Sequence, residues 1–146
     1  MTTRRQFLKT TALASAGLAF QGIYSKTNAA SYSRIAGAGK KVNLAHIGIG
    51  NRGWEIINDF DKTGLANVVA LCDVDLGGDH TLKAIEKFPN AKKFKDFREM
   101  FDKMGNEIDA VAIATPDFAH FPAVMMAIKE GKHVFVEKPM ARTFNE

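Results

Sequence analysis

The amino-acid sequence predicts an α/β fold with a doubly wound parallel sheet. Two observations lead to this prediction. From residue 41 onward, short apolar runs alternate with amphipathic stretches, as strands and helices do in this fold class. The segments after the apolar runs are rich in glycine or polar residues, and the carboxyl ends of parallel strands lie at one edge of a sheet. Right-handed crossovers between the strands then place a ligand-binding crevice at that edge.

The first expected strand, residues 42–47, leads through a glycine-rich turn into a helix over residues 52–62. Three glycines of this turn have the spacing G-x-G-x-x-G: Gly48, Gly50 and Gly53. In a dinucleotide site the first makes the tight turn, the second lets the backbone approach a pyrophosphate, and the third lets the helix lie close to the strand. The helix opens at about Asn51 and Arg52, so its free N–H groups and positive dipole end are expected to face the phosphates.

The second expected strand, residues 67–72, ends at Asp73, twenty residues after Gly53. A carboxylate at this spacing is expected to bind the ribose hydroxyls in the adenosine half of the cofactor. It would also repel a 2′-phosphate, and no Arg or Lys follows before Lys83, so the sequence favours NAD over NADP. A βαβ unit whose glycine turn binds nothing is the alternative interpretation of the same pattern.

Two helices and a short strand are expected next. The helix over residues 79–88 has Leu82 and Ile85 on its apolar face, and residues 91–94 form a weak strand. Asp96 is expected to cap the third helix. The apolar residues of that helix follow the i, i+3, i+4, i+7 pattern: Phe97, Met100, Phe101 and Met104. Its methionines are expected to fill the core, and no metal site is predicted.

The last part of the chain contains two further strands with a helix between them. Residues 108–114 are apolar on both faces, as the central strand of a parallel sheet should be. Asp117 is expected to cap the fourth helix. The apolar residues on the predicted buried side of that helix are Phe121, Val124, Met125 and Ile128. The fifth strand, residues 132–136, ends at the polar residues 137–139.

The front of the chain has the features of an export signal. Residues 3–9, TRRQFLK, match the twin-arginine motif S/T-R-R-x-F-L-K at every defined position. The mildly apolar residues 10–23 are too few and too rich in Ala, Gly and Thr to span a bilayer stably. We therefore expect a twin-arginine signal peptide over residues 1–30, a linker over residues 31–40, and export to the periplasm by the twin-arginine machinery. A disordered basic tail is the alternative.

The net charge of +4 arises in this front segment, since residues 1–40 hold six of the 20 basic residues and none of the 16 acidic ones. The remainder is slightly acidic and has no basic stripe with interleaved aromatic residues, so a nucleic-acid partner is not expected. The single cysteine, Cys72, is expected to be a small core residue. His46, in the first strand, is expected to be structural.

Two stretches resemble one family closely. The first is Thr115-Pro116-Asp117 with His120, which has the pattern T-P-x-x-x-H, and the second is residues 131–139, GKHVFVEKP, with the pattern G-K-H-V-x-x-E-K-P. Together with the glycine motif, these residues resemble the glucose–fructose oxidoreductase, inositol dehydrogenase and rhizopine-catabolism (Gfo/Idh/MocA) family. The resemblance extends over residues 41–146 and implies a Rossmann-type domain that binds NAD(P).

The resemblance also implies a nicotinamide-dependent oxidoreductase acting on a sugar, a polyol or a derivative. Lys138 matches the family lysine that lies near the nicotinamide and the substrate hydroxyl, so it is the expected catalytic residue. Glu137 is expected to fix this loop and its cofactor contacts. Thr115 and Pro116 match the loop that passes the cofactor ribose. His120 is expected either near the nicotinamide ring or at the start of a helix.

Residues 143–146, TFNE, fit a T-x-x-E capping box, which predicts the start of a helix. Members of the resembled family continue past this point, complete the domain and add a second α/β domain that carries the base for the hydroxyl proton. The resemblance thus implies that residues 41–146 form a domain incomplete at its C-terminus, inactive by itself. Contacts for a homo-oligomer would lie in the second domain.

Three functions remain open on this basis. The leading one is an exported NAD-dependent dehydrogenase for a sugar, polyol or derivative, with this chain as its nucleotide-binding half. The second is an NAD-dependent glycoside hydrolase of the same family, which oxidises, eliminates and re-reduces its substrate without net redox change. The third is a nucleotide-binding module without catalysis, and the presence of Lys138 argues against it.

Overall fold

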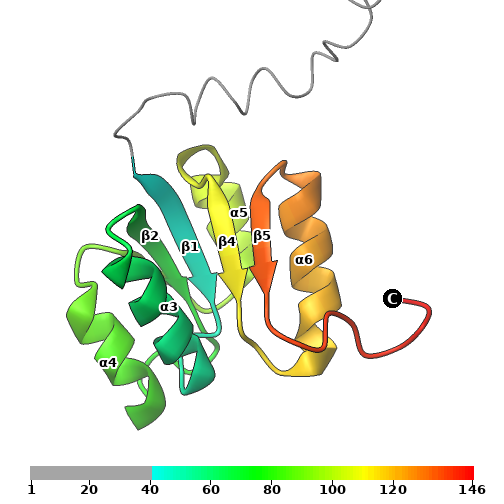
Figure 1. Cartoon of the computed structure of the whole chain (residues 1–146), viewed down its shortest axis with the longest axis horizontal. Helices are drawn as coiled ribbons and strands as arrows, with labels where there is room; N and C mark the ends of the chain where they lie inside the picture. Colours follow the sequence, from blue (N-terminus) through cyan, green and yellow to red (C-terminus); the bar gives the residue numbers. More distant parts are fainter. Residues whose placement is uncertain (1–40) are drawn as a thin grey trace, which may run out of the picture. The chain divides into compact units, whose positions relative to one another are not determined.

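Five strands that pair in parallel form one sheet at the centre of the described chain (Figure 1). The structure is a computed structural model that describes residues 41–146, and the predicted signal peptide and linker lie outside the described residues. The strands are β1 (Val42–Ile47), β2 (Ala66–Cys72), β3 (Lys92–Phe94), β4 (Ala110–Ile113) and β5 (His133–Val136).

The strand order β3-β2-β1-β4-β5 creates a reversal at the centre of the sheet. The chain winds outward from β1 to β3, then returns past β1 to form β4 and β5, so the reversal falls between β1 and β4. The carboxyl ends of the strands meet at one edge, at the bottom of Figure 1. In open α/β sheets the crevice at such a reversal binds ligands. The doubly wound fold predicted from the sequence is confirmed.

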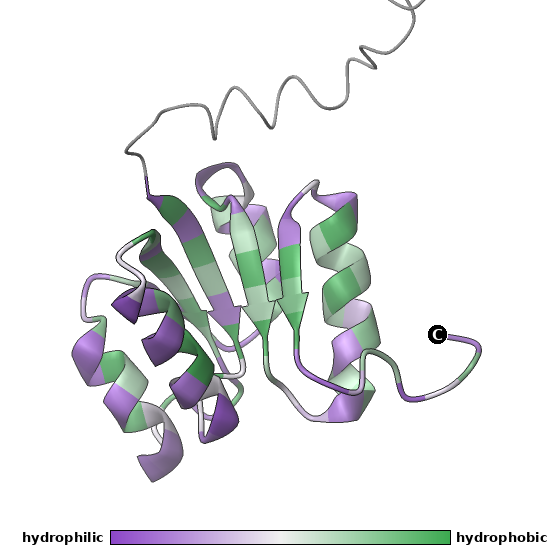
Figure 2. Ribbon diagram, in the orientation of Figure 1, coloured by the Kyte–Doolittle hydropathy of each residue, from purple (hydrophilic) through white to green (hydrophobic). Residues whose placement is uncertain are grey.

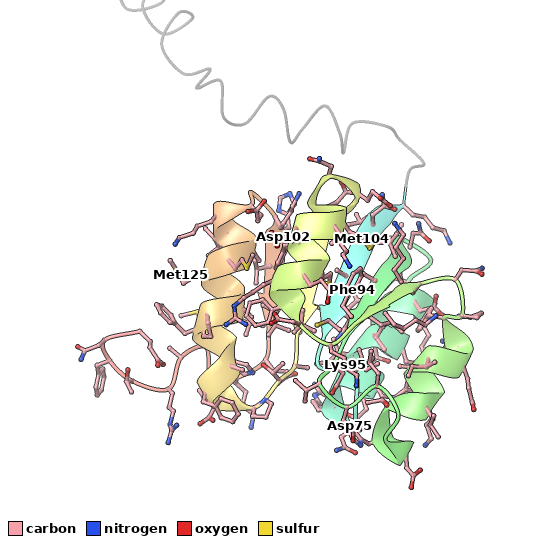
Figure 3. All side chains as sticks on the ribbon, turned by 180° about the vertical axis from the view of Figure 1, so that it is seen from behind. Asp75, Phe94, Lys95, Asp102, Met104 and Met125 are labelled. Carbon is pink, nitrogen blue, oxygen red and sulfur yellow. The ribbon has the colours of Figure 1, made fainter. Side chains whose placement is uncertain are left out.

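Helices cover both faces of this sheet. They are α3 (Arg52–Lys62), α4 (Asp79–Lys87), α5 (Phe97–Met104) and α6 (His120–Lys129), with short 3₁₀ helices η1 (Gly105–Glu107) and η2 (Asp117–Ala119). The opposite views of Figures 1 and 3 show α3 and α4 on one face and α5 and α6 on the other. None of the helices in residues 41–146 is long and apolar enough to cross a membrane.

The alternation of side chains along β1 divides the core into two layers. Ala45 and Ile47 join a hydrophobic cluster with Met100 of α5 and Ala123 of α6. Leu44 faces the other way, into a cluster beneath α3. Hydrophobic residues run along the strands, and α6 is more hydrophobic than α4 (Figure 2). Both faces of β1 are thus buried, as the central position of this strand requires.

Two titratable residues of the strands are buried in this core. His46 is fully buried, and neither of its ring nitrogens has a hydrogen-bond partner among the described residues. Burial lowers the pKa of His46 to about 4, so the imidazole is neutral in the folded protein at pH 7. Cys72 is also buried, which raises the pKa of its thiol to about 12. Both positions agree with the structural roles expected from the sequence.

The buried face of α4 differs from the predicted one. Thr81 and Ala84 are fully buried, whereas Leu82 is 39% exposed and Ile85 is only partly buried. The Thr81 hydroxyl donates a hydrogen bond of 2.8 Å to the carbonyl oxygen of Gly78. This buried polar group therefore has its partner in the loop before the helix. A prediction from hydrophobic periodicity assigns large apolar residues to the buried face. Close packing of this helix on its neighbours instead favours small residues there. The prediction for Leu82 was therefore wrong.

The buried face of α6 was also predicted wrongly. Ala123 and Ala127 are fully buried, while Ile128 is 55% exposed and Met125, labelled in Figure 3, is exposed as well. Small residues let this helix lie close to β4 and β5, and the larger apolar residues are turned outward. Only Val124 of the predicted set packs against the core, and it does so partly buried.

The start of α6 differs from the prediction too. Asp117 is the first residue of η2 and its Oδ1 accepts a hydrogen bond from the N–H of Phe118 at 2.7 Å. Since the 3₁₀ turn intervenes, α6 begins after Ala119 and Asp117 does not cap it. The Pro-Asp sequence thus forms a turn of its own before the helix.

The predicted cap of α5 is present, α3 is followed by a glycine, and residues 143–146 form a turn without a helix. Gly64, just beyond α3, has φ +71, in the left-handed region that glycine tolerates. The side chain of Asp96 caps α5 by accepting the N–H of Arg98 at 2.8 Å. Near the end of the chain, Oε2 of Glu146 accepts the N–H of Thr143 at 3.1 Å, which is one half of a capping box.

Candidate functional site

A cavity of about 500 Å³ lies at the carboxyl ends of the strands, beside the reversal between β1 and β4. Its walls come from the turn after β1, the loop after β2, the segment after β3 and the loop after β4. Seven predicted site residues line it: Gly48, Gly50, Asn51, Arg52, Asp73, Thr115 and Pro116. Four others lie outside this lining: Gly53, His120, Glu137 and Lys138. The structure therefore brings together the adenosine and pyrophosphate parts of the predicted site.

The turn after β1 is shaped by two glycines. Gly48 has φ +82, and a Cβ on it would lie 2.7 Å from the carbonyl carbon and oxygen of Ala114. A Cβ on Gly53 would lie 1.9 Å from the carbonyl oxygen of Gly48. The turn therefore packs on the end of β4, and α3 packs on the turn. The tight turn and the close helix–strand approach predicted from the spacing are present, while contact with a cofactor stays a prediction.

The middle glycine has a neighbour that the sequence did not indicate. A Cβ on Gly50 would lie 2.2 Å from Cδ2 of His80, the second residue of α4. The next residue, Asn51, has φ 43 and makes no side-chain cap to α3. A positive φ at a residue other than glycine carries backbone strain, and such strain gathers at functional turns. In this turn Asn51 is exposed, and the imidazole of His80 lies beside Gly50.

The carboxylate of Asp73 joins this turn to the loop after β2. Its Oδ2 accepts the N–H of Ile49 at 2.9 Å, and its Oδ1 accepts the N–H of Asp75 at 3.1 Å. These two bonds fix the direction of the carboxylate at the cavity wall. Because each carboxylate oxygen has a further lone pair, Asp73 can still accept hydrogen bonds from a ribose.

An ion pair ties the loop after β5 to the start of α3. Oε1 of Glu137 accepts a hydrogen bond from Nε of Arg52 at 3.0 Å, and its Oε2 accepts the N–H of Lys138 at 3.3 Å. The hydrogen bond from Arg52 lowers the pKa of Glu137. Lys138 itself is exposed at the end of β5, beside this pair. Glu137 thus joins the loop that carries Lys138 to α3, while its expected role in cofactor contacts stays a prediction.

The imidazole of His120 lies behind the rim of the cavity. It is 1% exposed, with Nδ1 2.6 Å from the carbonyl oxygen of Pro139 and Nε2 2.8 Å from the carbonyl oxygen of Thr115. Both ring nitrogens are thus engaged with the protein, so His120 presents no free nitrogen to a ligand. The hydroxyl of Thr115 is buried and has no partner among the described residues.

The lining also includes His80, Lys95 and Phe118, which the sequence did not predict as site residues. Lys95 directly follows β3, and Figure 3 shows it at the same end of the sheet as Asp75. Its position after a strand is a signal that the sequence contained, because ligands bind beyond carboxyl strand ends. His80 had no such signal, since only the packing of α4 brings it over Gly50.

The residues of the cavity fit a dinucleotide. Gly48 and Gly53, in the turn after β1, leave no room for a side chain, Asp73 faces the cavity with fixed orientation, and the buried Thr115 hydroxyl has no partner among residues 41–146. A buried polar group without a partner costs free energy, which a ligand can offset. Within residues 41–146, no three His, Cys, Asp or Glu side chains are grouped to hold a metal ion.

The strand order, the glycine turn at the reversal and the carboxylate after β2 define a dinucleotide-binding domain of the Rossmann type. Residues 42–146 match the GFO_IDH_MocA family, described as an oxidoreductase family with an NAD-binding Rossmann fold. The chain therefore belongs to the Gfo/Idh/MocA family, and NAD is the cofactor of this domain. The resemblance drawn from the sequence motifs is confirmed.

Curated relatives match almost the whole chain. The α-N-acetylgalactosaminidase of Shewanella oneidensis is 31% identical over 98% of this chain, which is 35% of that protein. A glycosyl hydrolase family 109 protein of Parabacteroides distasonis is 39% identical over 99% of this chain and 34% of its own length. This chain thus spans about a third of the length of the curated relatives it matches.

Solved structures of the family share the fold. The myo-inositol dehydrogenase of Lactobacillus casei, in complex with NAD(H) and myo-inositol, is 30% identical with a TM-score of 0.60. The match covers 69% of this chain and 29% of that chain.

Proposed function

We propose that this chain is the NAD-binding domain of a glycoside hydrolase that uses NAD without net redox change. The observation that carries the proposal is the 31% and 39% identity, along almost the whole chain, to an α-N-acetylgalactosaminidase and a glycosyl hydrolase family 109 protein. Their names support an α-N-acetylgalactosaminide as substrate. The sequence alone favours a dehydrogenase first and the hydrolase second, and the identity to these curated relatives supports proposing the hydrolase first.

Each loop at the carboxyl edge of the sheet has a role in the proposed reaction. A bound NAD would supply a hydride acceptor for a carbinol carbon of the substrate, and its reduced form would supply the hydride that restores this carbon. The turn at Gly50 receives the pyrophosphate and Asp73 accepts hydrogen bonds from the adenosine ribose. Lys138, at the end of β5, orients the substrate hydroxyl and assists removal of its proton. The pair of Arg52 and Glu137 holds the loop of Lys138 in place.

The test uses the product of the complete reading frame that contains this chain, with the NAD that it retains on purification. We expect release of p-nitrophenol from p-nitrophenyl α-N-acetylgalactosaminide without accumulation of NADH. Lys138→Met should lower kcat by roughly a hundredfold or more, because general acid–base groups contribute factors of this size. Lys129→Met, which alters an exposed lysine at the end of α6, is the matched control. Absence of glycosidase activity in the unmodified protein would reject the proposal.

A dehydrogenase is the second candidate, supported by the 30% identity to myo-inositol dehydrogenase. The same purified protein should then produce NADH in step with oxidation of a free polyol or sugar. The two candidates differ in this readout, because the hydrolase leaves no NADH after each turnover. Steady NADH formation without release of p-nitrophenol would therefore favour the dehydrogenase.

Export to the periplasm is part of the proposal. It is supported by the match of residues 3–9 to the twin-arginine motif, and the alignments to the curated relatives extend into this front segment, since they cover 98–99% of the chain. A twin-arginine substrate crosses the membrane folded, with its cofactor bound. A hydrolase that recycles its NAD suits a compartment in which free NAD is scarce.

A further inference from the structure

We infer that His120 is a positioning residue, whose imidazole ties the loop that carries Lys138 to the loop after β4 at the nicotinamide end of the cavity. This inference rests on the proposed function only in assigning catalysis to Lys138. The tie itself rests on the contacts of His120 with the carbonyl oxygens of Thr115 and Pro139.

The contacts join segments that are separate along the chain. His120 is the first residue of α6, five residues after Thr115 and nineteen before Pro139. At 1% exposure the ring is shielded from water, so its bonds to the two carbonyl oxygens do not compete with solvent. The imidazole therefore acts as a buried cross-link between the ends of β4 and β5.

The two contacts span the width of an imidazole ring. Both partners are carbonyl oxygens, so the ring donates a hydrogen bond to one of them, the tautomer decides which, and the other ring nitrogen lies against the second oxygen. A glutamine amide also carries N–H donors, so Gln at position 120 can keep a hydrogen bond to one of the two oxygens. An apolar residue of similar size keeps none.

The two anchors of the loop flank Lys138 on both sides. Glu137, the residue before it, is bound to Arg52 at 3.0 Å. Pro139, the residue after it, is bound through its carbonyl oxygen to His120 at 2.6 Å. Lys138 thus stands between two fixed neighbours, although its own side chain is exposed. This arrangement restricts the backbone at Lys138 while leaving its ammonium group available to a substrate.

The contact of His120 with Thr115 links the loop of Lys138 to the wall of the cavity. Thr115 lines the cavity, and its buried hydroxyl has no partner among the described residues. Asp73, by contrast, lies at the adenosine end, beyond β2. In a doubly wound sheet the dinucleotide spans the reversal, so the ends of β4 and β5 face its nicotinamide half. Loss of the tie should therefore weaken contacts to that half and spare the adenosine half.

The experiment compares NAD with ADP, which lacks the nicotinamide and its ribose, as ligands of the full 146-residue chain in titration calorimetry. His120→Leu should weaken NAD binding roughly five- to tenfold, the effect of about one lost hydrogen bond, and His120→Gln should weaken it less. Affinity for ADP should stay within about twofold in both variants. The matched control is His133→Gln, at the exposed amino end of β5, which should change neither affinity.

Two outcomes would overturn the inference. An equal loss of affinity for NAD and ADP would show a general loss of structure, and unchanged NAD affinity would show that the tie does not position the loop. If His120→Leu fails to fold, His120→Gln carries the comparison. If both fail, NMR of the unmodified chain decides: slowly exchanging imidazole N–H signals of His120 support the tie, and their absence rejects it. None of these measurements depends on glycosidase activity.

Discussion

Arg52 and Glu137 are 85 positions apart in the sequence, yet Nε of Arg52 lies 3.0 Å from Oε1 of Glu137. The pair connects the first turn of α3 with the loop after β5, across the ends of β1 and β4. Two loops that would hold opposite parts of one cofactor are thereby linked through the protein itself.

The stabilising contribution of the Arg52–Glu137 pair should depend on pH. The bond from Arg52 lowers the pKa of Glu137, so its stabilising contribution is present above the ordinary carboxyl pKa and is lost as pH falls through the lowered value of the folded protein. Arg52→Gln should return the titration of the Glu137 carboxyl, followed by NMR, toward its ordinary range. Glu55→Gln, which removes the other partner of Arg52, is the control and should leave it lowered. The same titration in all three proteins would contradict the prediction.

A second prediction separates the two roles of Asp73. Asp73→Asn keeps an acceptor for the N–H of Ile49 but removes the charge, so the preference for NAD over NADP should narrow while stability is largely kept. Asp73→Ala leaves the buried N–H of Ile49 unpaired and should also lower the free energy of unfolding by about 1–3 kcal/mol. Calorimetry and urea unfolding measure the two effects. If the unmodified chain binds NADP as tightly as NAD, the expected role of Asp73 in cofactor preference is wrong.

A third prediction concerns the buried histidine of β1. The pKa of His46 is about 4 in the folded protein against an ordinary value of 6.5. Below 6.5 the unfolded chain therefore binds a proton that the folded one does not, and stability should fall as pH decreases from 6.5 to 4, by roughly 3 kcal/mol in all. His46→Leu should remove this part of the slope in urea unfolding at a series of pH values. His133→Gln, which alters an exposed side chain, is the matched control. An identical slope in the His46 variant would refute the assignment.

A fourth prediction tests the turn after β1. Gly48→Ala places a Cβ 2.7 Å from the backbone of Ala114 at a φ of +82, so it should destabilise the domain by about 2–4 kcal/mol. Gly77→Ala adds a Cβ with no neighbour within 4 Å in the described part of the chain and should change stability by less than about 0.5 kcal/mol. Thermal unfolding of both variants measures the difference. Equal melting temperatures would mean that the turn can rearrange.

A fifth prediction addresses localisation. Replacing both Arg4 and Arg5 by lysine should leave the protein in the cytoplasm, because the twin-arginine motif depends on the arginine pair. Fractionation of cells that express the complete gene measures the distribution. Replacement of Arg34 by lysine, which makes the same charge-conserving change outside the motif, is the control. Undiminished periplasmic recovery of the Arg4 and Arg5 variant would refute export by this route.

The sequence by itself determined the fold class and the location of the site. Alternating strands and helices, each with its own period, predict parallel crossovers, and a parallel sheet has all its carboxyl ends at one edge. The spacing of Gly48, Gly50 and Gly53 placed the turn, and Asp73 marked the end of β2 at the same edge. These signals are local, because each depends on residues within one strand–turn–helix unit.

Only the tertiary structure decided which side chains meet across those units. The inward faces of α4 and α6 carry Thr81, Ala84, Ala123 and Ala127 because close helix–sheet contact favours small residues, which hydrophobic periodicity does not weigh. His80 over Gly50, and His120 between Thr115 and Pro139, are contacts between separate loops. Such contacts depend on where the whole sheet places the loop ends, so no pattern within a single segment of the sequence predicts them.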